Sequence, residues 1–240
     1  MLYLVPTPIS EGSYTSPEIC NAIKDCDYFV VEGVRTARRF ISSLKLGLKI
    51  DELEFVELSE HTLAEDVDSI LAPIKSGRRG VLMSEAGLPC VADPGGILVA
   101  AAHRAGVRVI PLVGASSLML ALMASGFSGQ SFAFNSYLPI KPQERVPAIR
   151  HFEQLALGSK ASKPQAQIFI ETPYRNISLF EEFLRVLRPA TMLSVSCDLT
   201  SKDEFIVTKS VSEWKNFKKI AEISKRPTIF IIYSAISSLR

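Results

Sequence analysis

The sequence predicts an α/β protein made of two α/β subdomains. In the first half, short apolar runs alternate with stretches of helical periodicity, which is typical of a mostly parallel sheet covered by helices on both faces. In the second half, apolar runs follow one another with little helix between some of them, which favours antiparallel pairs. We therefore predict an N-terminal α/β domain over residues 1–112, with a mostly parallel sheet, and a C-terminal α+β domain over residues 113–240.

The strands of the first half are short runs rich in β-branched, aromatic and other apolar residues. They are predicted at residues 2–5, 28–31, 54–58, 81–84 and 107–112. The first helix opens at Ser16, which is suited to the N-cap; Pro17 follows at the first helical position, and Glu18 supplies an acid in the first turn. Later helices are predicted at residues 36–46, 63–75 and 97–104.

The second half contains both helical periodicity and apolar runs typical of strands. Helices are predicted at residues 118–125, 144–157 and 177–187. Strands are predicted at residues 132–137, 168–171, 191–196, 205–209 and 228–233. The polar segment 158–165 contains lysine, glycine and proline, so we expect a mobile loop there.

Composition limits the possible classes of protein. Hydrophobic residues make up 47% of the chain and charged residues 22%, which is enough apolar material for a folded core. The net charge of +2 is not the footprint of a basic nucleic-acid-binding domain, so any contact with RNA must come from local clusters. The four cysteines lack C-x-x-C spacing, which indicates free thiols and no metal site. With no signal peptide or membrane-spanning run visible, we expect a soluble, cytoplasmic protein.

The most informative segment is SEAGLPCVADPGG at residues 84–96, between a predicted strand and a predicted helix. Loops at the carboxyl ends of strands are where open α/β sheets bind ligands. This loop carries two acids, Glu85 and Asp93, among glycines and prolines that allow close backbone approach. A tight structural turn is the alternative interpretation, and other segments of the chain favour the functional one.

Those other segments occur in register along the chain. They are LYLVPTPI at 2–9, VEGVR at 31–35, PLVGASS at 111–117, FIETPYR at 169–175 and DLT at 198–200. Together with the loop at 84–96, they resemble the tetrapyrrole methylase superfamily of S-adenosylmethionine-dependent methyltransferases. Within it, the chain is most similar to the branch that methylates a ribose 2′-hydroxyl of 16S ribosomal RNA. The resemblance extends from Met1 to about Ser234.

The resemblance implies that S-adenosylmethionine binds in a cleft between two α/β subdomains. The G-x-G-x-x-G fingerprint of dinucleotide-binding folds is absent, which gives no support to a Rossmann-type site. Carried over position by position, the resemblance implies a set of cofactor-binding residues: Pro8, Ser84, Glu85, Ala86, Gly87, Gly114, Ser116, Ser117, Glu171, Thr172, Pro173 and Thr200. The serine pair also suits the N-cap of the helix that follows, and both roles can hold together. The sequence names no catalytic base.

Basic residues are the candidates for contact with the acceptor. Arg35 and Arg39 have helical i, i+4 spacing with Arg38 beside them, and Lys141 and Arg145 form a second group. We expect them to contact RNA phosphates, although a solvated helix face is the alternative interpretation. The resemblance also implies a homodimer, with the small ribosomal subunit RNA as partner and with no membrane or metal partner.

The chain departs from the pattern of the ribosomal RNA branch mainly on the acceptor side. Gly33 and Val34 replace an Asp-Thr pair, Glu85 replaces an aspartate, Tyr174 a histidine and Cys197 an arginine. The cofactor side is better preserved, which favours donor binding. Two classes of protein stay open. The first is a methyltransferase that acts on RNA or, as the alternative acceptor, on a small tetrapyrrole. The second is a catalytically silent relative that binds the cofactor or RNA.

Overall fold

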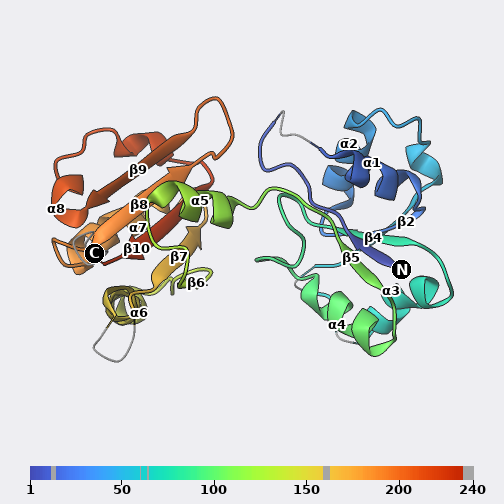
Figure 1. Cartoon of the computed structure of the whole chain (residues 1–240), viewed down its shortest axis with the longest axis horizontal. Helices are drawn as coiled ribbons and strands as arrows, with labels where there is room; N and C mark the ends of the chain where they lie inside the picture. The colour runs from blue at the N-terminus through green and yellow to red at the C-terminus, as the bar shows by residue number, and fades with distance from the viewer. Residues whose placement is uncertain (12–14, 60, 64, 159–162, 235–240) are drawn as a thin grey trace. The chain divides into compact units, whose positions relative to one another are not determined.

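The computed structural model describes residues 1–11, 15–59, 61–63, 65–158 and 163–234 (Figure 1). The chain divides into two compact units, Met1–Ser116 and Ser117–Arg240, whereas the sequence placed the boundary after residue 112. We call them the N-terminal and the C-terminal unit and describe each by itself. Residues 159–162 of the loop expected to be mobile lie outside the described residues.

The N-terminal unit is built on a five-stranded sheet in the order β3-β2-β4-β1-β5. Its strands are β1 (Leu2–Leu4), β2 (Tyr28–Val31), β3 (Glu54–Glu57), β4 (Gly80–Met83) and β5 (Val109–Pro111). Every neighbouring pair is parallel, which confirms the predicted parallel sheet. All five strands therefore end at the same edge, and the loops that follow them meet there.

Four helices cover the two faces of this sheet. They are α1 (Pro17–Lys24), α2 (Val34–Ser43), α3 (Asp66–Lys75) and α4 (Gly96–Arg104). Successive strand residues point to opposite faces. Tyr28 and Val30 accordingly belong to the core shared with α3 and α4, whereas Phe29 and Val31 belong to the core shared with α1 and α2. The first helix starts as predicted, with Ser16 Oγ accepting a hydrogen bond from the Ile19 N–H at 3.3 Å.

The connections from β2 and β4 leave these neighbouring strands in opposite directions. The chain passes from β2 through α2 to the edge strand β3, and from β4 through α4 to β5 at the other edge. The two helices lie on opposite faces of the sheet. This is a topological switch point, where a crevice opens beyond the carboxyl ends of the strands and open α/β sheets bind ligands.

The C-terminal unit contains a second five-stranded sheet, in the order β6-β7-β10-β8-β9. Its strands are β6 (Phe132–Phe134), β7 (Ala166–Glu171), β8 (Met192–Cys197), β9 (Phe205–Ser210) and β10 (Thr228–Tyr233). The pair β6–β7 is parallel and the other pairs are antiparallel, as the succession of apolar runs predicted.

Helices cover both faces of this second sheet. The longer ones are α5 (Ser117–Ser125), α6 (Pro142–Leu157) and α7 (Asn176–Val186). Residues of α6 and α7 share a core with one face, to which Leu193 and Val195 belong. Ser194 lies on the opposite face, where Thr208 Oγ1 donates to the Ser125 carbonyl of α5 at 3.0 Å and to Ser194 Oγ at 2.9 Å.

Three short helices were not predicted: η1 (Ile50–Glu52), α8 (Val211–Trp214) and η2 (Ile220–Ile223). They are too short to show a hydrophobic period. One of them nevertheless carries a signal, because Ser210 and Glu213 form a reciprocal capping box at the start of α8.

Within the described part of the chain, no helix is long and apolar enough to cross a membrane. The same residues contain no group of three or more histidine, cysteine, aspartate or glutamate side chains that could hold a metal ion. The cysteines Cys20, Cys26, Cys90 and Cys197 are free thiols.

Candidate functional site

The loop between β4 and α4 has an unusual backbone. Gly87 has a φ of +83°, Cys90 of +70° and Ala92 of +68°. The left-handed region suits glycine but is unfavourable for residues with a Cβ. Such conformations persist only where surrounding contacts hold them, and they are concentrated at functional sites. The loop therefore has the backbone expected of a binding loop.

The chain after β1 holds the first part of this loop. The Thr7 N–H donates to the Gly87 carbonyl at 2.9 Å, and the Gly87 N–H donates to the Thr7 carbonyl at 3.1 Å. Thr7 Oγ1 donates to the Ser84 carbonyl at 3.4 Å. A Cβ on Gly87 would lie 3.3 Å from Ile9 Cγ2, in addition to the strain of its positive φ. The neighbourhood of Pro8 is thus joined to residues 84–87, as the resemblance implied.

The chain after β2 holds the same loop from the other side. The Glu85 N–H donates to Glu32 Oε2 at 3.1 Å, and Thr36 Oγ1 donates to Glu85 Oε1 at 3.0 Å. A Cβ on Gly33 would lie only 2.5 Å from Glu85 Oε1. The absence of a side chain at Gly33 therefore leaves the space that the carboxylate of Glu85 occupies.

The chain after β5 makes the third close approach. A Cβ on Gly114 would lie 2.1 Å from Pro6 Cβ, so this backbone conformation excludes any larger residue. The carbonyl oxygen of Ala115 lies 3.6 Å from the position of a Cβ on Gly87. Three predicted segments, around Pro8, Ser84 and Gly114, are thus brought together at the carboxyl edge of the N-terminal sheet.

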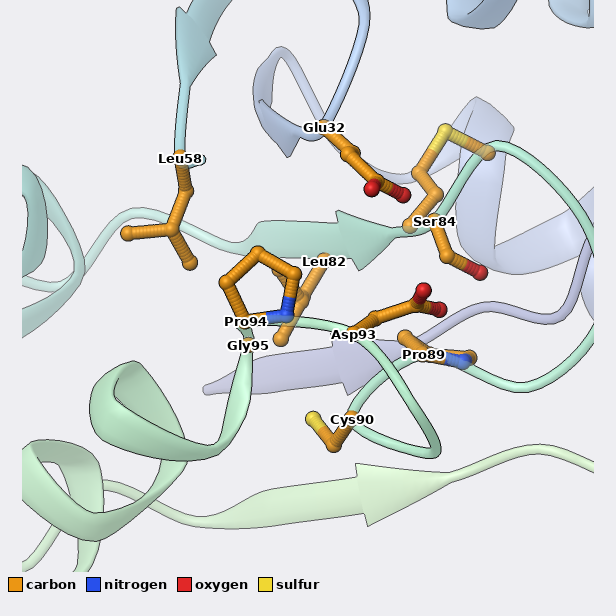
Figure 2. Close-up of a pocket in the computed structure, with 10 residues that line it drawn as sticks. Glu32, Leu58, Leu82, Ser84, Pro89, Cys90, Asp93, Pro94 and Gly95 are labelled. Atoms are coloured by element: carbon orange, nitrogen blue, oxygen red, sulfur yellow. The ribbon is translucent and has the colours of Figure 1, made fainter. Parts of the chain in front are cut away.

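A pocket lies at the switch point of this sheet. It is lined by Glu32, Leu58, Leu82, Met83, Ser84, Pro89, Cys90, Asp93, Pro94 and Gly95. The space that it encloses is far smaller than the roughly 300–1,000 Å³ of sites for drug-sized ligands, so it can admit at most one small chemical group of a larger ligand. Figure 2 shows the carboxylates of Glu32 and Asp93 pointing toward Ser84, whose hydroxyl lies on the Asp93 side.

Burial and the repulsion between neighbouring acids shift the pKa values of the groups in the pocket. Burial and the negative charge of Glu32 raise the pKa of Asp93 to about 6 from an ordinary value of 3.8; the neighbouring Ser84 hydroxyl opposes this shift, and Glu85 adds to it. Burial and the charge of Asp93 raise the pKa of the Cys90 thiol to about 11, so this thiol stays protonated and is a poor nucleophile. Ser84 Oγ and Asp93 Oδ2 are buried atoms without a hydrogen-bond partner among the described residues.

In the C-terminal unit, the predicted residue Glu171 is engaged within its own turn. Its carboxylate accepts hydrogen bonds from the Thr172 N–H at 2.6 Å and from Arg175 Nε at 2.9 Å. The Pro173 carbonyl accepts from the Lys225 N–H at 3.1 Å. Through these hydrogen bonds Glu171 stabilises the turn at the end of β7, which contains Thr172 and Pro173.

The remaining predicted cofactor residues lie at three places. Ser116 ends the N-terminal unit and Ser117 begins α5. Thr200 is exposed with a φ of +69°, and its N–H donates to Glu204 Oε2 at 2.7 Å. A left-handed conformation is strained for a β-branched residue. Contact between these residues and a cofactor stays a prediction.

The three arginines of α2 are not equivalent. Arg35 and Arg39 are exposed and have no ion pair among the described residues. The third, Arg38, pairs with Asp51 at 2.9 Å, and its guanidinium carbon lies 5.4 Å from the centroid of the Phe55 ring. Arg38 is therefore engaged by its own unit, whereas Arg35 and Arg39 remain available at the surface.

The two residues of the second basic group, Lys141 and Arg145, also differ in their exposure to solvent. Arg145 is only 9% exposed and lies 3.3 Å from Glu182, so it is held inside the C-terminal unit and is not placed to contact an RNA phosphate. The sequence could not show this because Arg145 falls on the inner side of α6, which periodicity alone did not resolve. Lys141 is exposed, with its Nζ 3.7 Å from Glu144.

Sequence reasoning missed the pairing of Glu32 with Asp93. Both residues lie in segments that were singled out, but they are 61 positions apart and were not connected. A signal was present, since Glu32 follows one predicted strand and Asp93 lies in the loop after another. The carboxyl ends of parallel strands share an edge, which brings such residues together once the strand order is known.

The chain was compared with known proteins. The family model for tetrapyrrole (corrin/porphyrin) methylases matches residues 1–215. "Ribosomal RNA small subunit methyltransferase I" of Escherichia coli O157:H7 is 26% identical over 96% of this chain and 76% of that protein. The protein of the same name from Xylella fastidiosa is 30% identical over 86% of this chain and 71% of its own length.

Solved structures show the same fold. The methyltransferase CobJ superposes with a TM-score of 0.64 at 16% identity, over 98% of this chain and 94% of that one. Uroporphyrin-III C-methyl transferase from Thermus thermophilus, in complex with S-adenosyl homocysteine, gives a TM-score of 0.57 at 17% identity, over 99% of both chains.

Proposed function

The chain belongs to the tetrapyrrole methylase family, and from this premise we propose that it methylates ribosomal RNA of the small subunit. It is an S-adenosylmethionine-dependent methyltransferase. The RNA acceptor is supported by relatives that are named as ribosomal RNA methyltransferases and match most of the chain. We infer that the methylated atom is a ribose 2′-hydroxyl of 16S RNA, because the sequence is most similar to that branch.

The observation that carries the donor site is the joining of three strand-end segments around Gly87. This residue and Gly114 approach their neighbours so closely that a Cβ would strain or exclude the conformation. Backbone groups in such a loop can approach a ligand directly. The buried Ser84 hydroxyl lacks a partner among the described residues, so a ligand group can supply one. The residues present therefore fit S-adenosylmethionine, and we assign Pro8, residues 84–87 and Gly114 to its site.

The other proposed contacts come from Ser116, at the end of the N-terminal unit, and from residues of the C-terminal unit. We assign Ser116 and Ser117 to the carboxylate of the donor, because the N–H groups at the start of a helix suit an anion. Thr172, Pro173 and Thr200 are proposed to contact the adenosine. Glu171 is a positioning residue in this scheme, because its carboxylate already binds Thr172 and Arg175.

S-adenosylmethionine supplies a methyl group for an in-line displacement. As the new O–C bond forms, the S–C bond breaks, the sulfonium becomes a neutral thioether and the acceptor hydroxyl loses its proton. The protein must hold the donor, orient the hydroxyl in line and let the proton leave. The loop at 84–87, which hydrogen bonds to Thr7 and Glu32 hold in place, serves the first of these tasks.

We propose that Arg35, Arg39 and Lys141 contact RNA phosphates. All three are exposed, and such contacts position RNA without reading its sequence. Because the ribosome is the proposed partner, we place the enzyme in the cytoplasm.

We also propose a homodimer. The chain has a mean hydropathy of +0.20, and Met123, Tyr137 and Ile140 expose large apolar side chains that a subunit interface would cover. Light scattering at micromolar concentration is expected to give the mass of two chains. A monomeric mass would contradict this assembly.

The experiment for the whole proposal is methyl transfer from tritiated S-adenosylmethionine to small ribosomal subunits from a strain that lacks the gene. We expect label in 16S RNA. Absence of label together with intact donor binding would point to a small tetrapyrrole acceptor or to a silent relative. Incubation with a tetrapyrrole precursor separates these two outcomes.

A further inference from the structure

The pocket at the switch point holds two acids and no base. Glu32 and Asp93 line it, and no lysine, arginine or histidine is among its lining residues. Neither acid forms an ion pair within the part of the chain that the structure describes. Glu32 accepts one backbone hydrogen bond, from Glu85, and Asp93 Oδ2 has no partner among the described residues.

Two neighbouring carboxylates without a positive charge nearby are unfavourable unless their negative charge is neutralised. Like charges that share a partly buried site repel each other, and the cost is removed by a proton or by a cation. The groups that face Asp93 are Glu32 from the end of β2, and Glu85 and Cys90 from its own loop. The first two are acids and the Cys90 thiol is neutral, so none of these neighbours in the described part of the chain supplies a positive charge.

A second observation indicates that a ligand enters the pocket. Ser84 is only 7% exposed and lines the pocket. Its hydroxyl lies close enough to Asp93 to lower the pKa of that acid, but it has no hydrogen-bond partner in good geometry among the described residues. Figure 2 shows this hydroxyl on the same side as the Asp93 carboxylate. A buried hydroxyl without a partner is unfavourable in a folded protein, so an absent ligand group is expected to pair with it.

We propose that Glu32 and Asp93, with the Ser84 hydroxyl, form a subsite that recognises the positive charge of the methyl donor. The inference rests on the proposed function and extends it to residues that were not assigned to the donor. Ser84 belongs both to this pocket and to the proposed donor loop, and Glu32 binds the N–H of the next residue, Glu85. The pocket therefore adjoins the loop.

The chemistry of the walls selects the kind of group that fits. Leu58, Leu82, Pro89 and Pro94 give an apolar lining, and the small space admits only a compact group. Two carboxylates attract a small organic cation and repel a phosphate. The pocket is thus unsuited to the RNA backbone and suited to the sulfonium or to the α-ammonium of S-adenosylmethionine.

Calorimetric titration of three ligands distinguishes these two cations. S-adenosylmethionine carries both charges, S-adenosylhomocysteine carries only the ammonium, and 5′-methylthioadenosine carries neither. The proteins are the parent, Asp93→Asn and Glu32→Gln, which keep the size of each side chain and an oxygen acceptor. If the pocket holds the sulfonium, each variant binds S-adenosylmethionine about tenfold more weakly and the other two ligands as the parent does. If it holds the ammonium, the first two ligands weaken and the third does not.

Glu57→Gln is the matched control, because Glu57 is an exposed acid at the end of β3 and is not among the residues that line the pocket. It removes the same charge from the same edge of the sheet, and it is expected to leave all three affinities unchanged. Unfolding curves of each variant show that the fold is intact.

A proton count gives a second readout. A bound cation lowers the pKa of Asp93, so donor binding to the parent near pH 6 must release a proton. This release is measured as a dependence of the binding enthalpy on the ionisation enthalpy of the buffer, and Asp93→Asn is expected to abolish it.

The contrary outcomes are distinct. Equal affinities in the parent and both pocket variants, or an equal loss for all three ligands, would overturn the charge-recognising subsite while leaving the donor site in place. A parent protein that binds no S-adenosylmethionine would overturn the proposed function itself, and the subsite with it.

Discussion

Gly33 and Glu85 are sterically linked, since a Cβ on Gly33 would lie 2.5 Å from Oε1 of Glu85. Both positions depart from the pattern of the ribosomal RNA branch, in which the sequence resemblance places aspartates. The structure connects the two departures. The longer carboxylate of Glu85 occupies the space that a side chain at position 33 needs, and Thr36 Oγ1 holds it there at 3.0 Å.

This link predicts non-additive substitutions. Gly33 is the N-cap of α2, a position at which aspartate is more favourable than glycine by roughly a few tenths of a kcal/mol, but in Gly33→Asp the new side chain must displace Glu85. Shortening the second residue in Glu85→Asp removes the conflict. We expect the double variant to be more stable than the two single effects predict, by about 1 kcal/mol or more in urea unfolding. Strictly additive effects would show that the two positions are independent.

The acid pair predicts that Asp93→Asn stabilises the ligand-free protein. The folded state raises the pKa of Asp93 to about 6, so the folded protein binds this proton more tightly than the unfolded chain. The resulting penalty is complete above pH 6 and decreases as the pH falls toward the ordinary value of 3.8. We expect a gain of about 1–2 kcal/mol at pH 8, after allowance for solvent screening, and about half of it at pH 5. Urea unfolding at both values measures it, and a gain that does not depend on pH would contradict this origin.

The backbone of Gly87 predicts a graded loss of donor binding. Its φ of +83° is unfavourable for any other residue, and a Cβ would also lie 3.3 Å from Ile9 Cγ2. Gly87→Val is expected to abolish S-adenosylmethionine binding in calorimetry, with Gly87→Ala intermediate, because a β-branched residue is the more strained. Thermal unfolding separates a lost site from a lost fold. Unchanged affinity in a folded Gly87→Val would remove the loop from the donor site.

The exposed arginines of α2 predict a change in salt dependence. Replacing Arg35 and Arg39 with alanine is expected to weaken RNA binding and to reduce the slope of log affinity against log salt by about 1.5 to 2, while donor affinity stays constant. Arg104 and Arg108 provide the control, since they lie at the end of α4 and just before β5, at the amino edge of the same sheet. Equal effects of the two double variants would show a general charge effect.

Much of the fold could be predicted from the sequence because its elements are locally encoded. The strand at Tyr28–Val31 and the helix start at Ser16 are marked by apolar runs and by a capping residue, and both appear where they were expected. The strand order could not be predicted in this way. It depends on long-range pairing, such as that of β1 between β4 and β5.

The candidate site was predictable only in part. The loop around Gly87 was found because glycine at a strand end carries a local signal. The partner of each charged residue is a tertiary property, so the sequence could not distinguish Arg145, buried against Glu182, from the exposed Arg39. For the same reason, it did not show that Glu32 and Asp93 share a pocket.

The central claim is that this protein transfers a methyl group from S-adenosylmethionine to a ribose of small-subunit RNA. The most direct measurement is mass spectrometry of nucleosides from 16S RNA, after incubation of unmethylated small subunits with donor that carries a deuterated methyl group. We expect deuterium in a single 2′-O-methylated nucleoside, and none when Gly87→Val replaces the parent protein. Deuterium on a base, or no deuterium in the RNA while the parent binds the donor, would contradict the claim.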